Sequence, residues 1–217
     1  MTIDTKIIPQ FLSDNELDVL EKHILSTDDI HHNYNPGSFG GEVFSGTYYI
    51  VRYYEEKNKL VKDILQPKLE QYLSPHLKVQ QIHIFDCCDP YNVHSDIDSG
   101  GPLLPDAPNH AWTLIIPLFD VDSHTIVFKE GNKVKQPMHH FKDVEPYPEM
   151  TIDIKTYKKY FTHIPIDFFK YLTIESIFPW KRGALFAADR FKFHTSDNFI
   201  ANGVKSKKAI IAWTSLP

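Results

Sequence analysis

The chain has 217 residues, 42% hydrophobic and 24% charged, which is enough for one domain with a sizeable core and excludes an intrinsically disordered chain. A formal charge of −5 gives no electrostatic reason to expect nucleic acid as a partner. There is no apolar run of about 18 residues and no signal-peptide pattern at the N-terminus, so we expect neither membrane insertion nor secretion.

The two cysteines, Cys87 and Cys88, are adjacent in the sequence. Neighbours on a strand point to opposite faces, so these two are poorly placed to form a disulfide or to share a metal. They therefore predict reduced thiols in a cytoplasmic protein.

The N-terminal part of the chain predicts two helices around a strand. Ser13 to Glu16 forms a capping box, and apolar residues follow at helical spacing, which predicts a helix over about 14–25. Residues 43–54 are rich in Tyr, Val and Ile, which predicts a strand. A second helix is predicted near 55–73, and Pro67 is expected to kink or divide it.

Beyond Pro75 the pattern changes to short strands separated by Pro- and Gly-containing loops, at 79–87, 112–119, 125–128, 183–187 and 209–214. This pattern predicts a mainly β protein with flanking helices, either a sandwich or a jelly roll. We expect a single domain over 1–217, in which 1–75 supplies N-terminal helices and an edge strand and 76–217 forms the core. The weakly patterned segment 131–179 reads as an insertion that ends in a short helix around 166–177, and we expect it to act as a lid.

The candidate metal site begins at His94 and Asp96. Residues i and i+2 of a strand share a face, so both side chains can point into one cavity. Joined by a second histidine, they would complete the 2-His-1-carboxylate triad of non-haem Fe(II) oxygenases. One His-x-Asp match is what chance predicts for this composition, so its surroundings must decide its meaning.

Those surroundings carry three further signals. His94 lies between a strand and a Gly- and Pro-rich loop, and His194 ends an apolar segment entered through Gly183. Lys207 follows 13 residues after His194, at the start of a strand that looks buried.

The motifs Tyr91-x-x-His94-x-Asp96 and Trp180-x-x-Gly183-x-Leu185-Phe186, followed by a distal histidine and a basic residue, resemble the Fe(II)/2-oxoglutarate-dependent dioxygenases. Within that superfamily the chain is similar to the prolyl-4-hydroxylase-like and phytanoyl-CoA-hydroxylase-like branches. The resemblance covers roughly residues 80–215.

The resemblance implies a double-stranded β-helix in which His94, Asp96 and His194 bind Fe(II). It also implies that 2-oxoglutarate and O2 are consumed, that succinate and CO2 are released, and that Lys207, or Lys208 in its place, pairs with the distal carboxylate of 2-oxoglutarate. Adjacent strand residues face opposite ways, so only one of the two lysines can reach the cavity. Related halogenases lack the carboxylate ligand, so Asp96 favours hydroxylation.

Other residues have two interpretations each. Tyr91 lines the cosubstrate pocket or simply packs, and Arg190 contacts substrate or cosubstrate or forms an ion pair. Ser196 and Asn198 orient the distal histidine or cap a turn. Four further histidines are interpreted as loop, core or surface residues: His83, His124, His139 and His140.

The sequence does not identify the prime substrate, which can be a peptidyl side chain or a small molecule. Two other functions stay open: a cupin-like metalloenzyme that uses no 2-oxoglutarate, and a jelly-roll binding module without enzymatic activity. Cupins usually present His-x-His, and this chain lacks that tripeptide.

Overall fold

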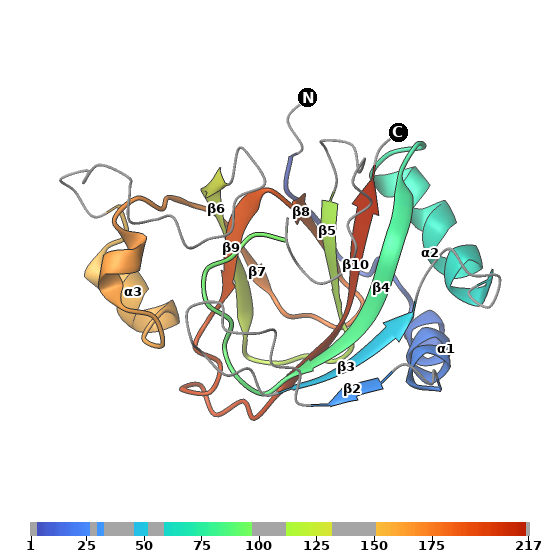
Figure 1. Ribbon diagram of the computed structural model, residues 1–217, viewed down its shortest axis with the longest axis horizontal. Helices are drawn as coiled ribbons and strands as arrows, with labels where there is room; N and C mark the ends of the chain where they lie inside the picture. The colour runs from blue at the N-terminus through green and yellow to red at the C-terminus, as the bar shows by residue number, and fades with distance from the viewer. Residues whose placement is uncertain are drawn as a thin grey trace.

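The computed structural model describes residues 4–26, 30–32, 46–51, 59–96, 112–131 and 151–215. Their strands form two antiparallel sheets that pack against each other, with two helices on the outer side of the larger sheet (Figure 1). This is the jelly-roll arrangement predicted from the alternation of short strands and turns.

The larger sheet has seven strands in the order β1-β8-β5-β10-β4-β3-β2. Every pairing in it is antiparallel, and the two central strands β10 and β4 stay in register over most of their length. The strands of this sheet are β1 (Lys6–Ile8), β2 (Ile30–His32), β3 (Gly46–Val51), β4 (Lys78–Cys87), β5 (Trp112–Pro117), β8 (Leu185–Asp189) and β10 (Lys207–Ser215).

The smaller sheet has three strands in the order β7-β6-β9. They are β6 (His124–Gly131), β7 (Ile174–Pro179) and β9 (Lys192–Ser196). Because β8 belongs to one sheet and β9 to the other, the short turn between them carries the chain across the sandwich. That crossing places the distal histidine opposite the larger sheet.

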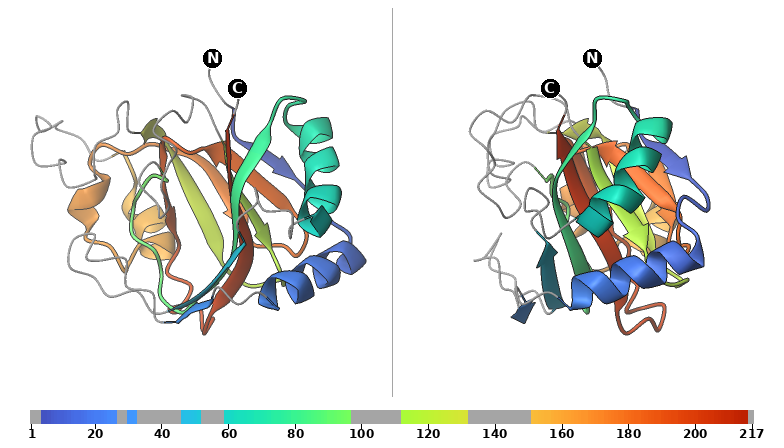
Figure 2. Two further views of the ribbon diagram at one scale, coloured as in Figure 1. Left: turned by 45° about the vertical axis from the view of Figure 1, so that its right-hand side comes forward. Right: turned by 90° about the vertical axis from the view of Figure 1, so that its right-hand side faces the viewer.

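Helix α1 (Asp14–Leu25) has the predicted start. The Ser13 side chain accepts from the Glu16 amide, and the Glu16 carboxylate accepts from the Ser13 amide, so both halves of the capping box are formed. The buried face of α1 carries Leu17, Leu20 and Ile24, which pack against residues of the larger sheet. Figure 2 shows the α1 ribbon beside that sheet.

Helix α2 (Lys59–Tyr72) runs through Pro67, so of the two predicted effects of this proline, a kink or a division of the helix, division is wrong. A proline removes one backbone hydrogen bond, a cost that buried neighbours can offset. Leu65 and Leu69 flank Pro67 on the buried face, whereas Pro67 itself is exposed. Packing of the apolar stripe therefore outweighs the local helix-breaking preference.

The segment 131–179 also differs from its prediction. The helix expected around 166–177 is wrong: residues Ile166–Phe169 form a 3-10 turn, η3, and Ile174–Pro179 form β7. A helix that was not predicted, α3 (Ile154–Tyr160), precedes them and is capped by the Asp153 side chain. The end of this segment is thus a core strand rather than part of an insertion.

The interior is divided by the two sheets. One apolar cluster lies between the larger sheet and helices α1 and α2, and another joins the outer face of the smaller sheet to α3 and η3. Between the sheets lies a third cluster, of Ile115, Val127, Phe178, Trp180, Ala184, Phe186, Ala188 and Ala209. Alternate side chains of a strand point to the same face, so Lys207, Ala209 and Ile211 of β10 all point toward the smaller sheet. The charged Lys207 side chain therefore lies in the space between the sheets.

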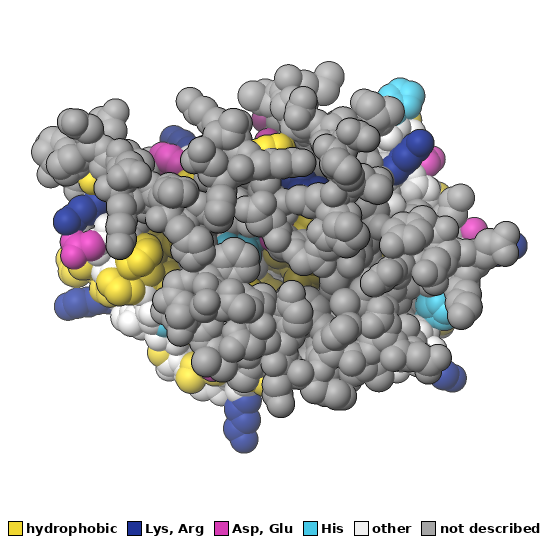
Figure 3. Space-filling view, viewed as in Figure 1, with side chains coloured by type: hydrophobic (Ala, Val, Ile, Leu, Met, Phe, Trp, Pro, Cys, Tyr) yellow, Lys and Arg dark blue, Asp and Glu magenta, His cyan; other side chains and the backbone are white. Residues whose placement is uncertain are grey.

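Within the described ranges, no helix has the length and apolar character needed to cross a bilayer. In the described part of the chain, large exposed apolar side chains include Ile154 and Phe168, which belong to the α3 and η3 segment. Figure 3 shows hydrophobic side chains on that side of the molecule.

Candidate metal centre

The segment that contains His94 pairs with β9 through a single antiparallel bridge. The His94 amide donates to the His194 carbonyl at 2.9 Å, and the His194 amide donates to the His94 carbonyl at 2.8 Å. Residues that exchange both hydrogen bonds lie directly opposite and project to the same side. The two imidazole rings accordingly lie 4.2 Å apart between centroids.

Asp96 is two residues along the same segment and is fixed by the turn that precedes β9. Its amide donates to the Arg190 carbonyl at 3.0 Å, and the Arg190 guanidinium donates to its carbonyl at 2.9 Å. Nitrogen and oxygen atoms of His94, Asp96 and His194 then lie within 4.8 Å of one another. The predicted triad converges on one point.

The imidazoles present the same nitrogen to that point. His94 Nδ1 lies 2.8 Å from the Asn92 carbonyl oxygen, and His194 Nδ1 lies 3.3 Å from the Lys192 carbonyl oxygen. A carbonyl oxygen only accepts, so Nδ1 carries the proton in both rings and the Nε2 lone pair is available. The Nε2 atoms lie 3.9 Å and 3.5 Å from the Asp96 carboxylate, which suits two neutral imidazoles and one carboxylate around a metal.

The surroundings keep His94 and Asp96 in their metal-binding protonation states. Burial and the nearby His194 lower the pKa of His94 to about 4, so its imidazole is neutral at pH 7. Burial acts to raise the pKa of Asp96, but the two imidazoles, the Thr113 hydroxyl and Arg190 outweigh it, and the pKa stays below its usual value. Neutral imidazoles and an ionised carboxylate are the forms that coordinate a metal.

Asp96 is also held from the larger sheet. The Thr113 hydroxyl on β5 donates to Asp96 Oδ2 at 2.5 Å, and both side chains are buried. Hydrogen bonds of this kind orient a ligand before the metal arrives. Thr113 was not predicted, and no spacing signal links a β5 threonine to residue 96.

The side chains of the two candidate lysines, Lys207 and Lys208, point to opposite faces of β10, as strand alternation requires. Lys207 is buried between the sheets, where its ammonium lies 4.2 Å from the centroid of the Trp180 ring and 3.3 Å from Ser123 Oγ. Lys208 points to the opposite side, toward Glu21 at 3.9 Å and Asp86 at 3.7 Å. Lys207 is therefore the lysine that faces the same interior as the triad.

Burial lowers the pKa of Lys207 to about 8. At pH 7 its ammonium is therefore mainly charged, in a surrounding of aromatic rings from Trp180 and Phe199. A charged group in such a place is costly unless it has partners of opposite charge. Lys207 is thus suited to bind an anion.

Tyr91 and Arg190 both contribute to the site framework. The Tyr91 ring lies 5.2 Å from that of His94, and its carbonyl accepts from the Thr195 hydroxyl at 2.6 Å and the Ser196 amide at 3.3 Å. Ser196 and Asn198 were considered as residues that orient His194. Their side chains bond elsewhere: the Ser196 hydroxyl donates to the Asp197 carbonyl, and the Asn198 amide group donates to the Thr162 hydroxyl.

Of the remaining histidines, His124 lies at the start of β6 and bonds to Asp197 through Nδ1 at 2.9 Å. His83 lies on β4, but its side chain is outside the described part of the structure, as are His139 and His140 and the loop 97–111. Among the described residues, one group of three or more potential ligands could hold a metal, and it is the His94 triad.

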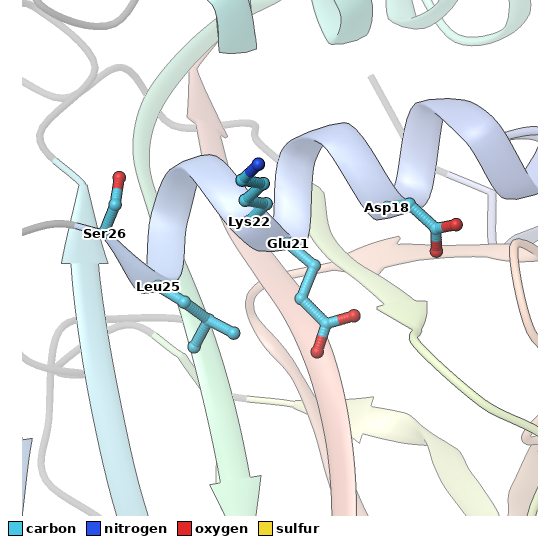
Figure 4. A pocket seen from close by; sticks show the side chains of 5 residues that line it. All are labelled: Asp18, Glu21, Lys22, Leu25 and Ser26. Atoms are coloured by element: carbon cyan, nitrogen blue, oxygen red, sulfur yellow. The ribbon is translucent and has the colours of Figure 1, made fainter.

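A separate open pocket lies along α1, lined by Asp18, Glu21, Lys22, Leu25 and Ser26 (Figure 4). Lys22 and Ser26 point in a different direction from Glu21 and Leu25, so the polar groups do not converge. The pocket contains none of the predicted site residues and carries no evident chemistry.

No protein-family model matches the chain, and no curated protein matches it. Solved structures do match. The α-ketoglutarate-dependent carbocyclase SnoK of nogalamycin biosynthesis is 18% identical with a TM-score of 0.57, over 97% of this chain and 79% of SnoK. The epimerase SnoN, solved with Fe3+ and α-ketoglutarate, is 15% identical with a TM-score of 0.57, over 97% of this chain and 78% of SnoN.

HygX from Streptomyces hygroscopicus, solved with nickel and 2-oxoglutarate, is 10% identical with a TM-score of 0.57, over 99% of this chain and 84% of HygX. The chain has the fold of the 2-oxoglutarate-dependent oxygenases. The predicted double-stranded β-helix is confirmed by these likenesses and by the two antiparallel sheets. At these identities the likeness concerns the fold.

Proposed function

We propose that this protein is an Fe(II)- and 2-oxoglutarate-dependent oxygenase that hydroxylates a peptidyl side chain or a small molecule and releases succinate and CO2. The observation that carries the proposal is the triad: two imidazoles with Nδ1 bonded to backbone carbonyls present Nε2 to one point beside Asp96. Two histidines and one carboxylate are the ligand set of non-haem Fe(II) oxygenases.

The residues fit the metal and its cosubstrate. His94, Asp96 and His194 would hold the iron, and Lys207 would bind the distal carboxylate of 2-oxoglutarate as a point charge. When bound, iron and 2-oxoglutarate supply the oxygen chemistry: one atom of O2 enters the substrate as a hydroxyl group and the other enters succinate.

The protein's own groups perform the remaining tasks. Thr113 and Arg190 hold Asp96 in place, and the bridge between His94 and His194 fixes the spacing of the two rings. The Trp180 and Phe199 rings lie against the buried Lys207 ammonium and exclude water from it. The His94 side chain remains 26% exposed, so we infer that the prime substrate approaches from its side.

The reaction type rests on Asp96. SnoK is described as a carbocyclase and SnoN as an epimerase, so the fold accommodates outcomes other than hydroxylation. A carboxylate ligand leaves no room for a coordinated halide, which favours hydroxylation over halogenation. The two free cysteines and the need for ferrous iron favour a reducing compartment, and we place the protein in the cytoplasm.

Anaerobic titration with Fe(II) and then 2-oxoglutarate tests the proposal. We expect a visible charge-transfer band that requires both additions and that disappears in His94→Ala, with His76→Ala as a matched control at an exposed histidine remote from the site. The proposal would be overturned by a band that needs neither the two additions nor His94, or by the absence of a band in folded protein. Metal binding without a response to 2-oxoglutarate would favour a cupin-like enzyme, and no metal binding would favour a binding module.

Succinate formation would then identify the substrate class. Prolyl peptides, free amino acids and nucleosides should be compared at equal concentration, each with Fe(II), O2 and 2-oxoglutarate. We expect one class to raise succinate release above the rate without substrate, and mass spectrometry of that substrate to show one added oxygen atom.

A further inference from the structure

A chain of hydrogen bonds leads from the start of β6 to the buried ammonium of Lys207. His124 Nδ1 lies 2.9 Å from Asp197 Oδ2, and the Ser123 hydroxyl lies 2.7 Å from Asp197 Oδ1. Lys207 Nζ lies 3.3 Å from the same Ser123 hydroxyl. Asp197 is fully buried, and none of these contacts involves the metal triad.

The donors and acceptors in this chain have a fixed direction. An ionised carboxylate only accepts, so Ser123 donates its one proton to Asp197 and can only accept from Lys207. Burial acts to raise the pKa of Asp197, but the hydrogen bonds from His124 and Ser123 and the charge of Lys207 outweigh it, and the pKa falls below its usual value. The ionised carboxylate therefore fixes the hydroxyl, and the hydroxyl fixes the ammonium.

Lys207 needs such a partner. It also lies against the faces of Trp180 and Phe199, at 4.2 Å and 5.1 Å from the ring centroids, and close to the Cys87 thiol. Aromatic faces attract a cation but do not replace the lost hydration of a buried ammonium. Asp197 is the buried carboxylate whose charge favours the protonated lysine.

Asp197 also connects the two sheets of the fold. It lies three residues beyond His194 and is bonded to Ser123, which immediately precedes β6, while Lys207 begins β10 on the other sheet. The carboxylate thus ties the segment that follows the distal metal ligand to the lysine across the space between the sheets. A shift of either sheet would alter the distance from triad to ammonium.

We propose that Asp197, acting through Ser123, is a positioning residue that keeps the Lys207 ammonium charged and in place for the distal carboxylate of 2-oxoglutarate. This inference rests on the proposed function. It predicts that Asp197 contributes to the recognition of that one carboxylate and contributes little to the binding of the metal or of the 2-oxo acid group.

The test compares two ligands in the same protein. 2-Oxovalerate has the 2-oxo acid group and chain length of 2-oxoglutarate but lacks the distal carboxylate. Each is titrated anaerobically into the Fe(II)-loaded protein, and the charge-transfer band reports its dissociation constant. The variants are Asp197→Asn, which removes the charge with little change in size, and Ser123→Ala, which breaks the link and keeps the charge.

For 2-oxoglutarate we expect the dissociation constant to rise at least about tenfold in both Asp197→Asn and Ser123→Ala, as for lost hydrogen bonds to charged groups. For 2-oxovalerate we expect a change of less than about twofold in both. Lys207→Met should abolish the preference for 2-oxoglutarate. Asp153→Asn, an exposed N-cap where asparagine also caps, serves as the control and should change neither value.

The outcomes separate the two proposals. If the wild-type protein gives no band with either ligand, the proposed function fails and this inference fails with it. If the wild type prefers 2-oxoglutarate but Asp197→Asn and Ser123→Ala keep that preference, or lose affinity for both ligands equally, Asp197 has only a structural role. The band with 2-oxovalerate shows in each variant that the folded metal site is intact.

Discussion

The ligands of the candidate metal centre are held by groups that do not touch the metal. Asp96 receives a hydrogen bond from Thr113 on the larger sheet and is clamped from the other side by Arg190. A carboxylate fixed in this way keeps one orientation, so less entropy is lost when the metal binds. The hydroxyl of Thr113 should therefore contribute to metal affinity.

Replacing Thr113 with Val removes that hydroxyl and keeps the shape of the side chain. We expect metal affinity to fall about 10- to 100-fold, the range found when a group that supports a ligand is lost. Titration with Fe(II) under argon, followed by the 2-oxoglutarate band, measures the change. Thr214→Val is the matched control, since Thr214 is also buried but bonds to the Trp112 backbone. Equal affinity in the wild type and Thr113→Val would contradict the role of Thr113.

The two thiols should differ in reactivity. Burial raises the pKa of Cys87 to about 12, and its thiol lies 2.7 Å from the Asp89 carbonyl oxygen, whereas Cys88 is exposed. The thiolate is the reactive form, and at pH 8 about one Cys87 in ten thousand is ionised. We expect iodoacetamide to label Cys88 in the native protein and Cys87 only after unfolding, as measured by peptide mass spectrometry. Rapid labelling of native Cys88→Ser protein would be inconsistent with a buried Cys87.

At the residue scale the triad could be predicted, and its supports could not. The spacing of His94 and Asp96 predicted that they share a face, and His194 was identified from the apolar segment entered through Gly183 and the lysine beyond it. His194 is not at the end of that strand, however: β8 ends at Asp189, and His194 lies on β9 in the other sheet. Thr113 and Asp197 act across the fold: Asp197 is 74 residues from Ser123. Residue spacing along the chain cannot predict a contact between residues so far apart. Ser196 and Asn198 were considered as residues that orient His194, whereas Asp197, which lies between them, was not considered.

Among the elements, α1 has the most clearly defined start. The Glu16 carboxylate accepts from both the amide and the hydroxyl of Ser13, and it pairs with Lys68 of α2 at 3.0 Å. Partial burial acts to raise the pKa of Glu16, but the Ser13 hydrogen bonds and Lys68 outweigh it, so the pKa is lowered. One side chain thus caps α1 and joins the two helices.

Glu16→Gln should separate these two tasks. Glutamine can still form the capping box, so only the charge and its pairing with Lys68 are lost. Because the folded pKa is below the unfolded value, the stability from the charge is present above about pH 4.5 and is lost as the pH falls through the folded pKa. We expect thermal unfolding of the wild type to approach that of Glu16→Gln between pH 5 and pH 3. A gap that stays constant over this range would show that the charge is not linked to folding.

The errors in predicting elements have physical causes. Pro67 lies inside α2 because the buried leucines on either side hold the helix to the sheet, an effect of tertiary packing that local propensity does not contain. Residues 174–177 belong to strand β7 although they were predicted to end a helix, since short apolar runs fit both periods. Most strands from β4 to β10 outside that segment were predicted, because turn residues bound their apolar runs, but β9 (Lys192–Ser196) was not.

In the whole molecule, the candidate site draws on both sheets. His194 belongs to the smaller sheet, whereas Thr113 and Lys207 belong to the larger one, and His94 and Asp96 come from the segment that follows β4. Without ligands, this places a carboxylate and an ammonium in the interior, each with a desolvation cost. A metal and 2-oxoglutarate would supply the opposite charges and join the sheets. Ligand binding should therefore stabilise the whole fold rather than one loop.

Thermal unfolding with Ni(II) and 2-oxoglutarate tests this coupling without oxygen chemistry. A ligand that binds only the folded state at about 100 times its dissociation constant adds about 2.7 kcal/mol, which for a chain of this size raises Tm by about 5–11 °C. We expect this shift in the wild type and its reversal by EDTA. Asp96→Asn should abolish the shift and lower the ligand-free Tm slightly, because the lowered pKa of Asp96 means that its charge is favoured in the folded state. A large loss of ligand-free stability in Asp96→Asn would instead mean that this carboxylate holds the fold together on its own account.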